Sequence, residues 1–99
     1  MVSIKVIRSH RDIVAICDSN LLGKKFEEGK LQLDVKESFF KGDEFDNQAA
    51  LVLICKMLRE DSTFYVAGKE AVDICIEAGV ISEENVSEVQ GIPFALVLL

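Results

Sequence analysis

The chain reads Thr63-Phe64-Tyr65-Val66-Ala67-Gly68 and continues with an apolar-periodic segment over residues 69–78 that ends at Gly79. The β-branched and aromatic residues of 63–67 predict a short strand. Residues 69–78 predict a helix, because glycine is a common residue just past a helix C-terminus. With a further strand predicted over residues 86–90, the segment is typical of a right-handed strand–helix–strand crossover with parallel pairing.

The regions on either side of this unit predict further strands. Residues 2–8 and 13–17, joined by a short polar turn, predict an antiparallel hairpin. After an irregular excursion over 21–29, the alternation of residues 30–36 predicts a third strand with one wet face. Near the C-terminus, residues 91–93 predict a turn and residues 94–99 a strand buried on both faces.

A second helix is predicted from an Asp46 N-cap to Arg59, after a turn over residues 39–44. Its many apolar residues leave little polar face, which predicts that it is mostly buried. The expected fold class is therefore α/β (α+β), as a single domain over residues 1–99. It has a mixed sheet of about five or six strands with an N-terminal antiparallel hairpin, a β-α-β crossover near the C-terminus, and two main helices mostly on one face.

Charge and hydropathy narrow the expected partners and compartment. The 99 residues carry 17 acidic and 11 basic side chains, a formal net charge of −6, which disfavours non-specific binding to DNA or anionic membranes. Local basic loops still allow a protein or RNA partner. No apolar run approaches the ~20 residues that span a bilayer, and the first residues lack the layout of a signal peptide. We expect a cytoplasmic protein without membrane association.

The cysteines and motifs predict no metal, no cofactor and no catalytic residue. Cys17, Cys55 and Cys75 are widely spaced, without a Cys-x-x-Cys pair and with one histidine in the chain, so we expect reduced, unpaired and mostly buried thiols. Cys17 differs from the other two cysteines in its surroundings, because the charged residue Asp18 follows it at the point where a loop begins. Three spaced glycines or a Gly-Lys-Ser/Thr loop, which nucleotide-binding motifs require, do not occur.

Two loops have the composition of anion sites. Gly68-Lys69 joins a strand to a helix N-terminus, where free amides suit an anion, although a glycine needed for a tight turn gives the same pattern. Gly23-Lys24-Lys25 carries two lysines that either hold a phosphate or carboxylate or are solvated surface charge. If the strand 13–17 runs parallel to 63–67, both loops share one sheet edge. If it runs antiparallel, they lie at opposite ends.

Five stretches together resemble the signature of a small archaeal family, the domain of unknown function 424. They are Val14-Ala15-Ile16-Cys17-Asp18, residues 21–29, Val66-Ala67-Gly68-Lys69-Glu70-Ala71-Val72, Ala78-Gly79-Val80-Ile81 and Gly91-Ile92-Pro93. The resemblance implies an archaeal, cytosolic, stand-alone α/β domain and supplies no activity. The family pattern continues with a polar pair near Pro93, where this chain has Phe94-Ala95-Leu96. The resemblance and the composition of the two loops together select the candidate ligand-binding residues, which are Cys17, Asp18, Gly23, Lys24, Lys25, Gly68, Lys69 and Pro93.

Competing functions follow from these observations. The favoured one is a non-enzymatic binding or adaptor protein, associated with translation or RNA machinery through basic loops such as Arg8, His10 and Arg11. The alternative is a small-molecule or nucleotide-phosphate binding protein, with enzymatic activity left open, that uses the Gly23-Lys24 loop and the Gly68 helix N-terminus. A homodimer through the apolar C-terminal strand is a third interpretation. A pocket formed jointly by the two loops would favour the alternative.

Overall fold

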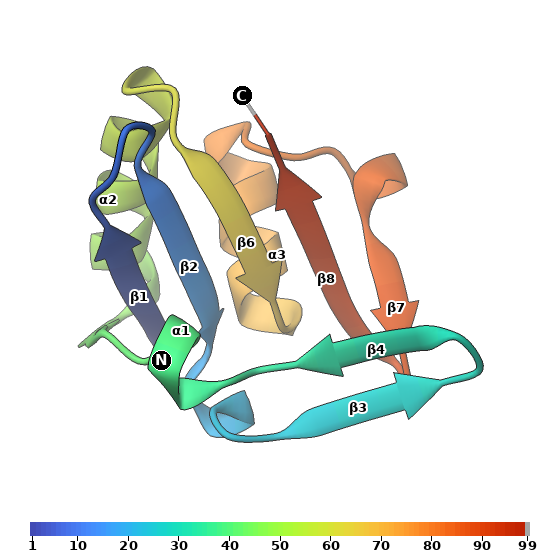
Figure 1. Cartoon of the computed structure of the whole chain (residues 1–99). Helices are drawn as coiled ribbons and strands as arrows, with labels where there is room; N and C mark the ends of the chain where they lie inside the picture. Colours follow the sequence, from blue (N-terminus) through green and yellow to red (C-terminus); the bar gives the residue numbers. More distant parts are fainter. Residues whose placement is uncertain (99) are drawn as a thin grey trace.

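A computed structural model, which describes residues 1–98, contains a six-stranded mixed sheet and a separate two-stranded hairpin (Figure 1). The large sheet has the order β5-β1-β2-β6-β8-β7. Its strands are β1 (Val2–Ile7), β2 (Ile13–Asp18), β5 (Asp43–Phe45), β6 (Thr63–Ala67), β7 (Ser87–Val89) and β8 (Ile92–Val97). The small hairpin consists of β3 (Lys25–Glu28) and β4 (Leu31–Asp34). The predicted fold class, a mixed sheet with an N-terminal antiparallel hairpin, is confirmed.

Strand β2 pairs antiparallel with β1 and parallel with β6. Cys17 lies opposite Ala67 in the parallel pair, so β2 and β6 end at the same edge of the sheet. This direction places Asp18 and Gly68, the residues that follow in the chain, beside each other. All other neighbouring strands in the large sheet are antiparallel.

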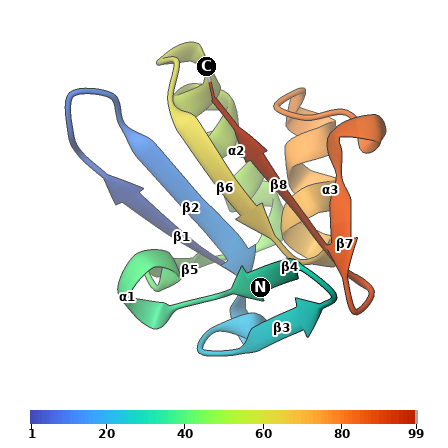
Figure 2. The ribbon, with the colours of Figure 1, turned by 45° about the vertical axis from the view of Figure 1, so that its right-hand side comes forward.

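Both main helices, α2 (Asn47–Arg59) and α3 (Lys69–Ala78), cover one face of the large sheet (Figures 1 and 2). The Asp46 side chain caps α2 by accepting a 2.8 Å hydrogen bond from the Ala49 amide. Gly79 ends α3 in the left-handed conformation, with φ of 84°. The predicted N-cap and C-terminal glycine are confirmed. The core on this face contains Val2, Ile4, Val14, Ile16, Ala50, Ile54, Met57, Phe64, Val66, Ala71, Val72, Ile74, Cys75, Val80, Ile81 and Ala95.

The prediction that the first main helix is mostly buried is wrong. Ala50, Ile54 and Met57 of α2 are buried, whereas Val52 keeps 68% of its surface exposed. The helix packs on the outside of the sheet, so only the side that faces the sheet and α3 can be buried, whatever the apolar content of the opposite side.

The crossover near the C-terminus is present, but the predicted parallel pairing within it is wrong. Strands β6 and β7 point the same way on either side of α3, and β8 lies between them, antiparallel to both (Figure 1). The chain reverses at Gln90 and Gly91, both with positive φ, as two-residue hairpin turns require. β8 therefore starts at Ile92, inside the segment predicted as a turn.

The second face of the sheet is covered at one end by the β3–β4 hairpin and by α1 (Glu37–Phe40) (Figure 2). β3 and part of α1 lie in segments predicted as irregular or as a turn, and two 3-10 turns, η1 (Ser19–Leu21) and η2 (Glu83–Asn85), complete the chain. The hairpin leaves part of this face open, so Leu96 of β8 is 53% exposed. The prediction of a last strand buried on both faces is wrong for Leu96, and Leu99 lies outside the described residues.

Candidate functional site

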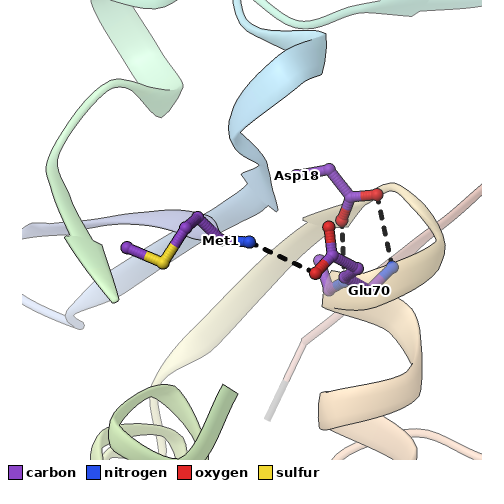
Figure 3. A network of polar contacts seen from close by, with 4 residues as sticks. Met1, Asp18 and Glu70 are labelled. Carbon is purple, nitrogen blue, oxygen red and sulfur yellow. Dashed lines mark hydrogen bonds and ion pairs between the residues drawn. The ribbon is translucent and has the colours of Figure 1, made fainter. Parts of the chain in front are cut away.

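Asp18, at the end of β2, caps the N-terminus of α3 (Figure 3). Its Oδ1 accepts a 2.8 Å hydrogen bond from the Ala71 amide and its Oδ2 a 3.2 Å bond from the Glu70 amide. Asp18 is only 7% exposed. Met1 joins the same network, because its amino group donates to Glu70 Oε1 at 3.2 Å. A negative group at this position neutralises the positive end of the helix dipole, so Asp18 stabilises α3.

Gly68 packs directly against the Asp18 carboxylate. Its φ is +107°, and a β-carbon at this residue would stand 2.6 Å from either carboxylate oxygen of Asp18. The Gly68 amide donates a 2.8 Å hydrogen bond to the carbonyl of Pro93. Three of the predicted site residues, Asp18, Gly68 and Pro93, are thus brought together, and only glycine fits beside the Asp18 carboxylate.

Burial raises the pKa of two acidic groups at this edge, Asp18 and Cys17. It raises the pKa of Asp18, although the amides of Ala71 and Glu70 lower it in part. Burial raises the pKa of Cys17 to about 12, with a further contribution from the charge of Asp18. The Cys17 thiol is therefore protonated at neutral pH, unlike a nucleophilic cysteine, whose pKa is lowered by its surroundings. Within residues 1–98 the three cysteines are free, as predicted.

The Gly23 loop lies at the same sheet edge as the N-terminus of α3 (Figure 1). The Gly23 amide donates to the Val35 carbonyl at 2.8 Å, and the Lys24 amide to the Leu21 carbonyl at 3.0 Å. The Lys24 and Lys25 side chains are exposed. No ion pair within residues 1–98 involves either lysine. At the N-terminus of α3, the Glu70 and Ala71 amides are bonded to Asp18 and the Gly68 amide to the Pro93 carbonyl, so an anion at this turn would need other donors.

A groove of about 430 Å³ lies beside this edge, between α3 and the β7–β8 hairpin. Its apolar lining is Val72, Ile76, Val86 and Pro93. Its charged lining is Lys69, Asp73, Glu83 and Glu88, with Gly91 completing the wall. Lys69 and Pro93 were predicted as site residues. The sequence pattern did not single out Asp73, Glu83 or Glu88, and residues 23–25 do not line the groove.

Among the described residues that line the groove, Lys69 alone is cationic, and it is bonded to Asp73 with 2.7 Å between its Nζ and Oδ2. This hydrogen bond raises the pKa of Lys69, and the charges of Asp73, Asp18 and Glu83 raise it further. The charges around Lys69 are therefore predominantly negative. A groove of this kind suits the burial of an apolar group that carries positive charge nearby.

The basic cluster at the first hairpin is balanced by carboxylates. Arg8 forms an ion pair with Asp12. His10, Arg11 and Asp12 line a hollow of about 280 Å³ together with Glu60 and Asp61.

Within residues 1–98, no group of three or more His, Cys, Asp or Glu side chains is placed to hold a metal ion. Of the helices in the same residues, none has the length and apolar composition that a membrane crossing requires.

The structure is similar to the crystal structure of an uncharacterized conserved protein from Methanopyrus kandleri, with a TM-score of 0.86 over 97% of this chain and 89% of that chain. At 22% identity, this likeness shows a shared fold. A search of curated proteins finds no match. The model of the family described as "Protein of unknown function (DUF424)" matches residues 7–99, and the chain therefore belongs to this family.

Proposed function

We propose that the chain is a non-enzymatic binding or adaptor protein, and that its partner is another protein that docks in the groove between α3 and the β7–β8 hairpin. The composition of the groove carries this proposal: an apolar floor of Val72, Ile76, Val86 and Pro93 lies beside charged side chains at the surface. Binding sites commonly combine an apolar lining with a few placed polar groups.

Other groups at the sheet edge support binding rather than catalysis. The Cys17 thiol is buried with a pKa of about 12, and both oxygens of Asp18 are bonded to α3. These groups serve the structure. The alternative function, a protein that binds a nucleotide phosphate at the Gly68 turn, would need donors besides the Glu70 and Ala71 amides.

The basic loops support an association with RNA or the translation machinery less well than the groove supports a protein partner. Arg8 and Arg11 precede β2, whereas Lys24 and Lys25 follow it, so the whole length of this strand separates the two clusters. Asp12 also pairs with Arg8. A continuous basic surface, on which nucleic-acid affinity depends, is not formed by these residues.

Two tryptophan variants test the docking site. Glu88 lines the groove, and neighbouring residues of a strand point to opposite faces, so Glu88→Trp obstructs the groove while Ser87→Trp adds the same bulk on the other face. Each tagged variant is used to capture proteins from nuclease-treated lysate of the source organism. A partner retained by the wild type and Ser87→Trp but lost with Glu88→Trp supports the proposal. Equal capture by both variants, or loss of every partner on nuclease treatment, contradicts it.

A further inference from the structure

We infer that the segment bound in this groove is cationic and aliphatic: a peptide stretch with a leucine, isoleucine or valine side chain flanked by lysine or arginine. This inference rests on the proposed function and adds the chemistry of the partner.

The floor of the groove determines the apolar part of the partner. Val72 and Ile76 lie one turn apart on α3, and Val86, which follows η2, and Pro93 of β8 complete the apolar lining. All four are aliphatic, and none of them donates a hydrogen bond from its side chain. A branched aliphatic side chain placed here removes apolar surface from water on both partners.

The rim determines the charge of the partner. Lys69 is paired with Asp73, whereas Glu83 and Glu88 are exposed and form no ion pair within residues 1–98. Residues 42–99, which supply the whole groove, contain eleven acidic and three basic side chains. Complementary charge across an interface favours a cationic segment here. A nucleic acid would instead place its phosphates beside Glu83 and Glu88.

Direct binding of synthetic peptides tests this chemistry. The probe is a fluorescent lysine–leucine–lysine–valine–lysine peptide, and its binding to the whole chain is followed by fluorescence anisotropy. Two control peptides replace either every lysine by glutamate or both aliphatic residues by serine. A single-stranded oligouridine is the nucleic-acid control. We expect saturable binding of the cationic aliphatic peptide alone, weakened by added salt. Stronger binding of the acidic peptide or of the oligonucleotide would overturn the inference.

Neutral variants of the rim provide the matched control. The double variant Glu83→Gln with Glu88→Gln should lower the affinity for the peptide by about fivefold. Exposed ion pairs contribute about 0.2–1 kcal/mol each, and 1.4 kcal/mol is tenfold in affinity. Glu84 lies in the same η2 turn but does not line the groove, so Glu84→Gln should leave affinity unchanged. Because the double variant removes two charges and Glu84→Gln one, a loss of binding free energy for Glu84→Gln of half that of the double variant or more would show that only net charge matters, and would overturn the site.

The two proposals fail in different ways. If Glu88→Trp abolishes capture of a cellular partner while the cationic peptide does not bind, the inferred partner chemistry is wrong and the docking groove stands. If capture is insensitive to Glu88→Trp, the docking groove itself is wrong.

Discussion

The Asp18 carboxylate fills the space beside Gly68 in which any larger residue would place its side chain. A β-carbon at residue 68 would stand 2.6 Å from both carboxylate oxygens, and the same oxygens accept hydrogen bonds from the amides of Glu70 and Ala71. Carboxylate and glycine together connect the end of β2 to the start of α3. The helix N-terminus, which suits an anion in many proteins, here binds an anion of the chain itself.

Gly68→Ala should lower the free energy of unfolding by about 2–6 kcal/mol, since the backbone at Gly68 (φ 107°, ψ 157°) lies in a region nearly restricted to glycine, which costs about 1–3 kcal/mol, and steric crowding costs about 1–3 kcal/mol. Gly79→Ala is the matched control, because Gly79 has φ of +84° but a β-carbon added there would meet no atom within 4 Å. Gly79→Ala should cost only the about 1–2 kcal/mol of a left-handed backbone without crowding, and therefore less than Gly68→Ala. Urea denaturation measures both. Equal costs would mean that Asp18 does not occupy the space beside residue 68.

The pH dependence of stability should reveal the environment of Asp18. Burial raises its pKa above the ordinary value, so the folded state binds this proton more tightly than the unfolded state. The resulting stabilisation is complete below the unfolded pKa of ~3.9 and is lost as pH rises through the higher folded pKa. The stability advantage of the wild type over Asp18→Asn should therefore shrink with rising pH in this window. An advantage that grows with pH, measured by denaturation at each pH, would show a lowered pKa.

Thiol labelling should separate the three cysteines. Burial raises the pKa of both Cys17 and Cys75 to about 12, whereas Cys55 is partly exposed on α2. In the native state a disulfide reagent should label Cys55 first, and the Cys55→Ser variant should react only as fast as the protein unfolds. All three thiols should react in denaturant. Rapid native labelling of Cys17 would show that the sheet edge opens.

Core variants of α2 test which side of this helix is buried. Ile54 is fully buried and Leu53 only partly so. Ile54→Ala should cost about 2–5 kcal/mol of unfolding free energy, and Leu53→Ala clearly less. Both are read from urea denaturation. A greater cost for Leu53→Ala would place the helix in a different rotation on the sheet.

Local signals in the sequence predicted most of the elements. Gly79 and Asp46 mark helix ends through interactions within a few residues, and the alternation in residues 2–8 and 13–17 requires only neighbouring side chains. The position of β8 between β6 and β7 could not be predicted in this way. Strand neighbours are set by contacts between distant segments, and the apolar pattern of β8 is compatible with several positions in a sheet.

The same distinction applies to the candidate site: local signals predicted one part of it, and the rest depends on contacts between distant segments. The strand–glycine–helix pattern placed Gly68 at a helix N-terminus, which the structure confirms. The ligand of that N-terminus is Asp18, which precedes Glu70 by 52 residues and meets it only because β2 and β6 are parallel. The groove brings together residues from α3, η2, β7 and β8, and no spacing in the sequence indicates that they meet.

The most direct measurement is a titration of the ¹⁵N-labelled chain with inorganic phosphate, followed through the amide shifts of Glu70 and Ala71. Both amides already donate to Asp18, so neither should show saturable shifts in the wild type. Saturable shifts of these two amides, together with those of Lys24 and Lys25, would show that the helix N-terminus is an open anion site and would contradict the cap by Asp18.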